Sequence, residues 1–252
     1  MLDGKKGLIV GVANERSIAA GCAMEMAGAG AKLALTYYND KALPHVEPVA
    51  KAAGAEMLLK LDVTNEDELA AAFDDVKATW GAIDFLVHSI AYCSKEDLHA
   101  PVVECSRDGF AQAMDISCHS FIRMARAAVD LMPHGGALLT MTYHGAEKVV
   151  DHYNIMGPVK AALEASVRYL ADDLGARRIR VNALSPGPIA TRAASGIGHF
   201  DKLLDEASER APGGRLVTIE EVGAAAAFLA SDAARSITGG VHYIDNGYNV
   251  VA

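Results

Sequence analysis

Two tyrosines and one lysine carry the clearest chemical signal in the sequence. Tyr153 and Lys160 are seven residues apart, which on an α-helix corresponds to about 700° of rotation and roughly 10 Å along the axis. The two side chains would therefore share one helix face. An ammonium near a phenol lowers the pKa of the phenol and makes it a better donor to a developing oxyanion. Tyr143 ends the preceding apolar run, so we expect it at the same site.

The elements that must position these residues alternate along the chain. Short apolar runs, continuous rather than alternating in polarity, occupy 7–12, 32–37, 57–63, 84–91, 137–143, 179–184 and 241–245. Segments of helical spacing occupy 17–28, 66–80, 109–132, 153–174 and 218–230. Buried strands joined by helix-length connections are typical of a parallel sheet with both faces covered. We therefore predict one α/β domain over residues 1–252, a doubly wound Rossmann-type fold with a seven-stranded parallel sheet.

One stretch breaks this alternation. Residues 187–214 contain Pro188 and Pro212 and directly follow Pro186. A long irregular excursion inside a compact α/β domain is usually a binding loop or a lid. We expect this segment to be a substrate-binding lid.

The turn after the first predicted strand is suited to a nucleotide. Gly11 would let the backbone approach a ligand, and Ser17 can cap the next helix, whose free N–H groups suit a pyrophosphate. The turn lacks the G-x-G-x-x-G fingerprint, so an ordinary serine-capped turn is the alternative. With a dinucleotide in place, the face shared by Tyr153 and Lys160 would address the nicotinamide ribose.

The ends of the next strands refine this prediction. Tyr38 follows the second strand without the arginine pair that would bind a 2′-phosphate, which favours NADH over NADPH, although Lys41 is close by. Asp62 and Val63 end the third strand and could contact adenine. The segment 89–91, Ser89, Ile90 and Ala91, ends the fourth strand, where a dinucleotide would cross the sheet.

Composition narrows the classes of function. The 252 residues are 51% hydrophobic, and 23 basic against 32 acidic residues give a net charge of −9, which disfavours disorder and nucleic-acid binding. The four cysteines show neither a C-x-x-C pair nor metal-ligand spacing, so we expect reduced thiols, no metal site and a cytoplasmic location. No apolar run is long enough for a membrane helix.

These motifs together resemble the short-chain dehydrogenase/reductase superfamily, in particular its divergent branch of bacterial NADH-dependent enoyl-acyl-carrier-protein reductases. The Gly-x5-Ser-x-Ala turn matches Gly11, Ser17 and Ala19, and the Tyr-x6-Lys motif matches Tyr153 and Lys160. The branch's second tyrosine, ten residues earlier, matches Tyr143. The similarity extends from residue 4 to about 248. Ordinary carbonyl-reducing members have Tyr-x3-Lys instead, which disfavours a ketoreductase.

The resemblance implies reduction of a trans-2-enoyl thioester on acyl carrier protein in fatty acid elongation. It implies that Tyr153 donates to the thioester oxygen, that Lys160 holds the cofactor ribose, and that Tyr143 borders the thioester. The residues expected to bind NADH are Gly11, Ser17, Ile18, Tyr38, Asp62, Val63, Ser89, Ile90, Ala91, Lys160, Ile189 and Thr191. The residues expected to wall the acyl site are Tyr92, Cys93, Tyr143, Met156, Ala193, Ala194, Ile197 and Phe200.

Further expectations concern partners and departures from the family pattern. The resemblance implies a homotetramer built through 109–132 and 153–174, and docking of the acidic carrier protein would need a local basic patch involving Arg192 and Lys202. Pro158 is expected to kink the helix that presents Lys160. Tyr92 and Cys93 replace the common Phe-Ala or Phe-Ser, which would alter the acyl pocket.

Two alternative functions stay open at this point. One is an NAD(P)H-dependent reductase of another enone or carbonyl. The other is a non-catalytic NAD-binding sensor, against which the presence of Tyr143, Tyr153 and Lys160 speaks.

Overall fold

The fold is a seven-stranded parallel sheet with helices on both faces. The computed structural model describes residues 1–191, 198 and 200–251, and the strand order is β3-β2-β1-β4-β5-β6-β7. The strands are β1 (Lys6–Val10), β2 (Lys32–Tyr37), β3 (Met57–Lys60), β4 (Phe85–His88), β5 (Gly136–Met141), β6 (Ile179–Pro186) and β7 (Val241–Ile244). The predicted doubly wound fold is confirmed, and every predicted strand is present.

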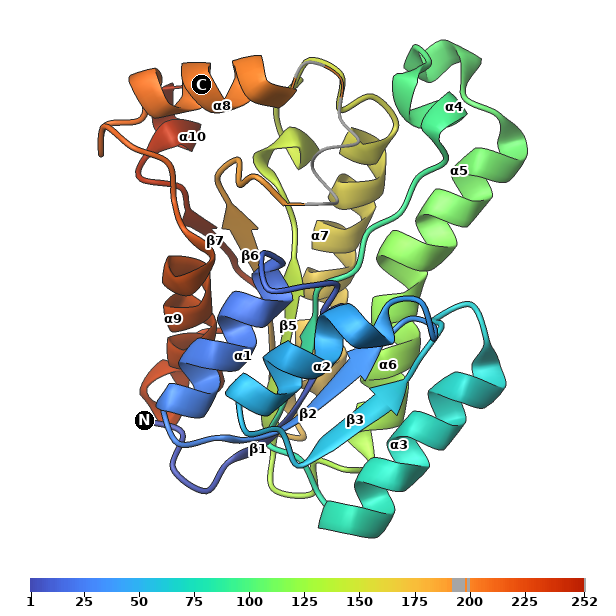
Figure 1. Cartoon of the computed structure of the whole chain (residues 1–252), viewed down its shortest axis with the longest axis vertical. Coiled ribbons are helices and arrows are strands. Elements are labelled where there is room, and N and C mark those ends of the chain that lie inside the picture. Colours follow the sequence, from blue (N-terminus) through green and yellow to red (C-terminus); the bar gives the residue numbers. More distant parts are fainter. Residues whose placement is uncertain (192–197, 199, 252) are drawn as a thin grey trace.

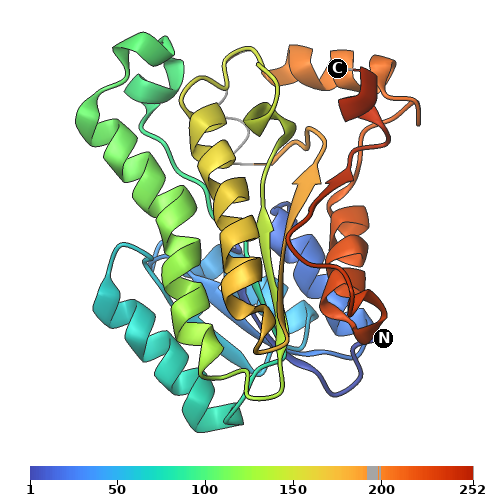
Figure 2. The same cartoon turned by 180° about the vertical axis from the view of Figure 1, so that it is seen from behind.

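Two helical layers enclose the sheet. The helices are α1 (Ile18–Gly28), α2 (Leu43–Ala52), α3 (Glu66–Trp80), α4 (Lys95–His99), α5 (Arg107–Met114), α6 (Ser120–Val129), α7 (Met156–Gly175), α8 (Phe200–Arg210), α9 (Ile219–Ala230) and α10 (Tyr248–Val251). Helices α1, α2 and α9 cover one face, and α3, α6 and α7 cover the other (Figures 1 and 2). Beyond the carboxyl ends of the strands, α4 and α5 flank one side and α8 and α10 the other.

The apolar character of the strands explains why helices pack on both faces of the sheet. Side chains alternate across a strand, so Leu8 and Val10 of β1 enter the core under α6 and α7, whereas Ile9 enters the core under α1 and α9. All three are at most 1% exposed. Each strand thus contributes to two cores, which is why the runs are continuously apolar rather than alternating.

The structure corrects four details of the sequence prediction. The helix of Lys160 begins at Met156, so Tyr153 lies before it. The predicted helix 109–132 is α5 and α6 joined by a π-helical segment, Asp115–His119. The excursion 187–214 is not wholly irregular, because it contains α8. Helix α2 was missed because Pro44 and Pro48 lie within it, although Val46, Val49 and Ala50 form its buried stripe.

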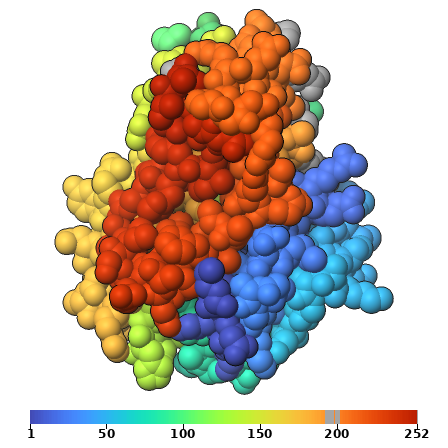
Figure 3. Space-filling view, turned by 90° about the vertical axis from the view of Figure 1, so that its left-hand side faces the viewer, coloured from blue at the N-terminus to red at the C-terminus, as the bar shows by residue number. Residues whose placement is uncertain are grey.

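The N-terminal segment packs beside α9 and the turn that follows it, whereas the C-terminus lies at the other end of the molecule, beside α8 (Figure 1). In Figure 3 the orange-red segment that contains α9 borders the dark blue N-terminal segment. Lys5 forms an ion pair with Asp232 at 3.4 Å, and α1 packs along α9. Within the described residues, no helix is both long enough and apolar enough to cross a membrane.

Helices α1 and α9 approach closely through two glycines. A Cβ at Gly21 would lie 2.2 Å from the carbonyl oxygen of Ile219, and one at Gly223 would lie 2.4 Å from the carbonyl oxygen of Gly21. These contacts are backbone to backbone, so no side chain can rotate away to make room. Glycine is therefore required at both positions for α1 and α9 to pack against each other.

We predict that Gly21→Ala lowers the free energy of unfolding by about 1–3 kcal/mol, because the methyl group overpacks the α1–α9 contact. Gly28→Ala, in the same helix, is the control, because an added Cβ there meets nothing within 4 Å. That control should raise the free energy of unfolding by up to about 1 kcal/mol. Urea unfolding measures both, and equal effects of the two substitutions would contradict the close approach.

Candidate active site

The predicted cofactor residues lie along one edge of the sheet. Because all strands are parallel, the segments that follow β1, β2, β3, β4 and β6 leave the sheet at its carboxyl edge. Strand order reverses between β1 and β4, and such a switch point opens a crevice for a ligand. The residues predicted for the cofactor on these segments are Gly11, Ser17, Ile18, Tyr38, Asp62, Val63, Ser89, Ile90, Ala91, Ile189 and Thr191.

Gly11 forms the narrowest part of this edge. Its φ is +106°, and a Cβ would lie 2.1 Å from the carbonyl oxygen of Ser89 and 3.2 Å from a side-chain carbon of Ile90. Only glycine fits this conformation and this contact. The β1 turn and the β4 end therefore touch at the switch point, as a dinucleotide site requires.

Ser17 begins α1 as the sequence predicts. Its Oγ accepts the N–H of Ala20 at 3.3 Å and donates to the carbonyl of Asn14 at 2.7 Å. The hydroxyl thereby fixes both the turn and the start of the helix. The positive end of the α1 dipole points to the same edge as Gly11, and this arrangement suits a phosphate.

The segment that follows β3 is anchored by a side chain of α6. Arg123 of α6 donates to the carbonyl oxygen of Val63 at 2.7 Å and to Asp115 at 2.7 Å. Asp62 uses Oδ1 to accept both the N–H and the hydroxyl of Thr64, at 2.9 and 2.7 Å. Arg123 was not predicted, because its acceptors lie 8 and 60 residues away.

Tyr38, which is predicted to lie near the adenosine ribose, is 58% exposed at the end of β2.

Tyr153 lies in a tight turn before α7, not within the helix. His152 and Asn154 on either side of it have positive φ values of 62° and 43°, and Asn154 donates its side-chain N–H to the carbonyl of Leu98 at 2.6 Å. The shared helix face predicted for Tyr153 and Lys160 is therefore wrong. Pro158 lies in the first turn of α7, where the missing N–H breaks no interior helical bond, so the predicted kink is also wrong.

The two tyrosines meet at the end of β5. Their rings are 5.1 Å apart with an interplanar angle of 68°, and His144 stacks on Tyr143 at 4.6 Å. The hydroxyl of Tyr143 is buried and finds no hydrogen-bond partner among the described residues. Buried polar groups are rarely left unsatisfied, so this hydroxyl marks a place for a polar ligand atom. Met156, predicted as an acyl wall, packs in the same cluster as both tyrosines.

Burial controls the ionisation of these groups. Burial is the largest cause that raises the pKa of the Tyr153 phenol above its ordinary value, and Tyr143 and Glu164 raise it further. The pKa of Tyr143 is raised for the same first reason. The prediction that Lys160 lowers the pKa of Tyr153 is therefore wrong for this structure. Both phenols therefore stay protonated at neutral pH and remain able to donate a hydrogen bond.

Lys160 is a buried cation. Its side chain is 4% exposed, and its Nζ donates to the carbonyl oxygen of Met141 at 2.7 Å. Burial lowers the pKa of Lys160 from 10.5 to about 8, partly offset by Cys118 and Glu164. Lys160 therefore points to the carboxyl edge beside Tyr143, close to where a nicotinamide ribose is expected.

The predicted acyl wall is described only in part. Tyr92 is held at its backbone by Ser117, whose Oγ accepts from the Tyr92 N–H at 2.8 Å and donates to its carbonyl at 3.0 Å. Cys93 is half-buried and packs against the tyrosine cluster. Ala193, Ala194 and Ile197 lie outside the described residues, and of Phe200 only its position at the start of α8 is described.

Two buried networks beside the site escaped the sequence analysis. His88 Nδ1 contacts the hydroxyl of Thr140 and its Nε2 contacts that of Ser120, both at 2.8 Å. The Thr142 hydroxyl donates to Glu164 at 2.6 Å. In the sequence, the only indication of these networks is Glu164, a carboxylate one helical turn after Lys160, and this indication is weak.

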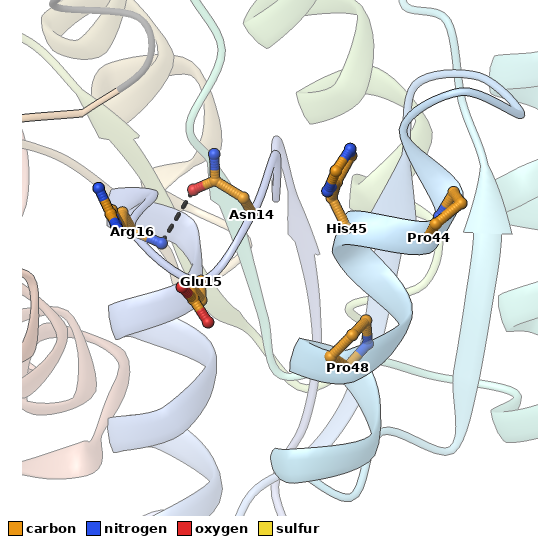
Figure 4. A pocket seen from close by; sticks show the side chains of 6 residues that line it. All are labelled: Asn14, Glu15, Arg16, Pro44, His45 and Pro48. Carbon is orange, nitrogen blue, oxygen red and sulfur yellow. Dashed lines mark hydrogen bonds between the residues drawn. The ribbon is translucent and has the colours of Figure 1, made fainter.

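A groove of about 360 Å³ opens beside the β1 turn. It is lined by Asn14, Glu15, Arg16, Pro44, His45 and Pro48, and the Arg16 N–H donates to Asn14 Oδ1 at 2.9 Å (Figure 4). None of the predicted site residues lines this groove. It borders the proposed phosphate turn on the α2 side, away from the tyrosines.

The identity of the chain follows from comparison with known proteins. The family model for enoyl-(acyl carrier protein) reductase matches residues 11–249. The chain belongs to the enoyl-(acyl carrier protein) reductase family. The resemblance inferred from Gly11, Ser17, Tyr143, Tyr153 and Lys160 is thereby confirmed.

Named relatives of this reductase agree over their full lengths. The NADH enoyl-acyl-carrier-protein reductase 1 of Rhizobium meliloti is 52% identical over 251 residues, which cover 100% of this chain and 92% of that protein. The crystal structure of the Anaplasma phagocytophilum reductase in complex with NAD has a TM-score of 0.96 at 44% identity, covering 100% and 96% of the two chains. The Bacillus cereus reductase, solved with NADP+ and an indole naphthyridinone, has a TM-score of 0.97 at 47% identity, covering 100% and 98%.

The buried Lys160 makes the stability of this reductase depend on pH. The folded-state pKa of about 8 lies below the ordinary 10.5, so between these values the unfolded chain binds more protons and stability rises with pH. We predict that the free energy of unfolding of the wild type rises relative to Lys160→Met by about 1.4 kcal/mol per pH unit in this window. Urea unfolding at about pH 7, 8, 9 and 10 measures it, with the exposed Lys51→Met as control. A pH-independent difference would contradict the burial of a charged Lys160.

Proposed function

We propose that this protein uses NADH to reduce the trans-2 double bond of enoyl thioesters carried by acyl carrier protein in fatty acid elongation. The observation that carries the proposal is the cluster at the end of β5: the unpartnered buried hydroxyl of Tyr143, the ring of Tyr153 against it, and the buried Lys160. The named relatives, with identities of 44–52% over nearly whole chains, support the same activity.

The cofactor fits the residues present at the sheet edge. Gly11 leaves the space that a Cβ would fill beside Ser89, and the start of α1 at Ser17 offers N–H groups to a pyrophosphate. Lys160 would hold the nicotinamide ribose, and Ile18, Val63, Ile90, Ile189 and Thr191 would complete the site. NADH, when bound, supplies the hydride. Tyr38, exposed and uncharged, follows β2 where a 2′-phosphate would need cations, which favours NADH over NADPH.

The tyrosines act on the substrate as neutral donors. Hydride addition at the β carbon of the enoyl group places negative charge on the thioester oxygen. The Tyr153 hydroxyl donates a hydrogen bond to that oxygen, and because burial raises its pKa it does so without ionising beforehand. Tyr143 borders the same oxygen with its own buried hydroxyl. Protonation of the α carbon then completes the saturated chain.

Lys160 positions the cofactor while remaining charged. Its bond to the Met141 carbonyl aims the ammonium at the carboxyl edge, so that its remaining N–H groups can reach the ribose hydroxyls. Since the pKa of Lys160 is about 8, the side chain is mostly charged at neutral pH and loses its charge as the pH rises above that value. Cofactor binding should weaken above that pH.

Two substitutions separate these roles. Tyr153→Phe should lower kcat for crotonyl-thioester reduction about 100-fold or more while changing the Kd of NADH less than about twofold, because it removes a donor to the oxyanion. Lys160→Met should weaken NADH binding at least about tenfold. NADH absorbance follows turnover and NADH fluorescence follows binding. Lys51→Met, which changes an exposed lysine on α2, is the control.

The same assay decides between the alternatives. Steady oxidation of NADH by enoyl thioesters, in preference to free enones and ketones, supports the proposal. Full activity of both variants, or NADH binding without any oxidation by the wild type, would overturn it. The second result would instead identify a non-catalytic NAD-binding protein.

We further propose that the acidic carrier protein docks beside the lid, residues 187–214, through Arg192 and Lys202. Lys202 of α8 is 78% exposed and pairs with Glu206 at 3.5 Å, whereas Arg192 lies outside the described residues. The net charge of −9 makes such a local cationic patch necessary for an acidic partner.

Charge reversal tests this docking site. Arg192→Glu combined with Lys202→Glu should raise the KM for the carrier-bound substrate about three- to tenfold through lost steering. The KM for an uncharged N-acetylcysteamine thioester should stay unchanged, and Lys51→Glu on α2 serves as the control. An unchanged KM for the carrier-bound substrate would refute the patch.

A homotetramer and a cytoplasmic location complete the proposal. Phe110 of α5 and Tyr169 of α7 are 43% and 76% exposed, which supports an interface through these helices. All four cysteines are free thiols, as a reducing compartment would keep them.

A further inference from the structure

Glu164 is a buried carboxyl group that the reaction described above does not use. It lies on α7 one turn after Lys160 and is 5% exposed. Its Oε1 accepts the Thr142 hydroxyl at 2.6 Å. Carboxylates are almost never fully buried unless they are paired, so this position needs an explanation.

The strand end opposite α7 arranges Glu164 and the site together. We call Met141, Thr142 and Tyr143 the β5 exit. Its three consecutive residues contact three groups in turn: the Met141 carbonyl accepts from Lys160, the Thr142 hydroxyl donates to Glu164, and the Tyr143 ring packs on Tyr153. Glu164 is therefore held by the same short segment as the two proposed functional side chains.

The other ionisable groups around Lys160 are neutral. Burial lowers the pKa of His88, on β4, to about 3, and burial raises the pKa of the Cys118 thiol, in the π-helical segment, above 9.0. Tyr153 stays protonated as well. Among the described groups that act on Lys160, Glu164 is thus the one that can carry a negative charge in the neutral range. Across the described residues, no carboxylate lies within 4.0 Å of the Lys160 ammonium, so Glu164 acts on Lys160 without a direct ion pair.

The pKa of Glu164 is raised overall, although several of its neighbours lower it. Burial and Glu147 raise its pKa, whereas the Thr142 hydrogen bond, Arg168 and Lys160 lower it. The hydrogen bond from Thr142 favours the ionised form, because an ionised carboxylate accepts more strongly than a neutral acid.

We propose that Glu164, held by Thr142, is a positioning residue that supplies the buried counter-charge of Lys160 and thereby keeps its ammonium charged for the cofactor ribose. The inference rests on the proposed role of Lys160 in NADH binding. The separation of more than 4 Å leaves the ammonium hydrogens available for the ribose, which a direct ion pair would occupy.

The pH dependence of NADH binding tests this role. In the wild type the Kd of NADH should rise through a midpoint near the Lys160 pKa of about 8. Glu164→Gln keeps the shape and an acceptor for Thr142 but removes the charge, so its midpoint should fall by about one pH unit. At about pH 8.5 the variant should then bind NADH about five- to tenfold more weakly than wild type, relative to their values at about pH 6.5.

Two further variants make the result specific. Asp173→Asn removes an exposed carboxylate from the same helix and should leave the midpoint unchanged. Thr142→Val removes the donor that favours ionised Glu164, so its midpoint should shift in the same direction by a smaller amount. Because Thr142→Val retains the carboxyl group, it provides the test even if Glu164→Gln does not fold.

Coincident midpoints for wild type, Glu164→Gln and Thr142→Val would overturn the inference. The readout is binding, so it stays interpretable whether or not enoyl thioesters are reduced. A wild type that binds NADH with the predicted midpoint but reduces no enoyl thioester would refute the proposed function and leave the counter-charge intact.

Discussion

The burial of one ammonium group governs the arrangement of this site. Lys160 is buried where α7 packs on the sheet, and its position is fixed by a hydrogen bond to the Met141 carbonyl. A buried cation is costly unless neighbouring groups compensate for it. The β5 exit meets this requirement through consecutive residues, with a carbonyl for Lys160 and a hydroxyl that orients Glu164. Tyr143, the next residue, then has its place against Tyr153 set by the same backbone.

The second constraint is the close approach of the β1 turn and the β4 end. Gly11 touches the Ser89 carbonyl with no room for a side chain, so the two halves of the doubly wound sheet meet where a dinucleotide would cross. The helical layer behind β1 depends on a similar contact, because α1 and α9 meet through Gly21 and Gly223. The β1 turn, the end of β4 and the start of α1 are therefore all positioned by backbone contacts. Side chains such as Tyr38 can vary without disturbing this framework.

The sequence predicted the parts of the structure that depend on local pattern. All seven strands were found because each is an apolar run that serves two cores, and Ser17 was found because its type and position define a helix start. Helix α2 was missed because Pro44 and Pro48 disfavour a helix prediction, even though the buried residues of α2 follow helical spacing. The spacing of Tyr153 and Lys160 could not distinguish one helix from a turn followed by a helix. The direction of the Tyr153 pKa depended on burial, which residue spacing does not contain. The partners of Glu164 and His88 were also out of reach, because Thr142 and Thr140 lie 22 and 52 residues away.

A direct titration of Lys160 tests the central claim of this account. Protein labelled with 13C at the lysine ε-carbon, with Lys160→Met used to assign the resonance, reports the charge of this side chain by NMR as pH is raised. The account predicts a midpoint near 8 for Lys160. A midpoint above 10 would contradict the claim that burial outweighs the neighbouring charges in setting the ionisation of Lys160.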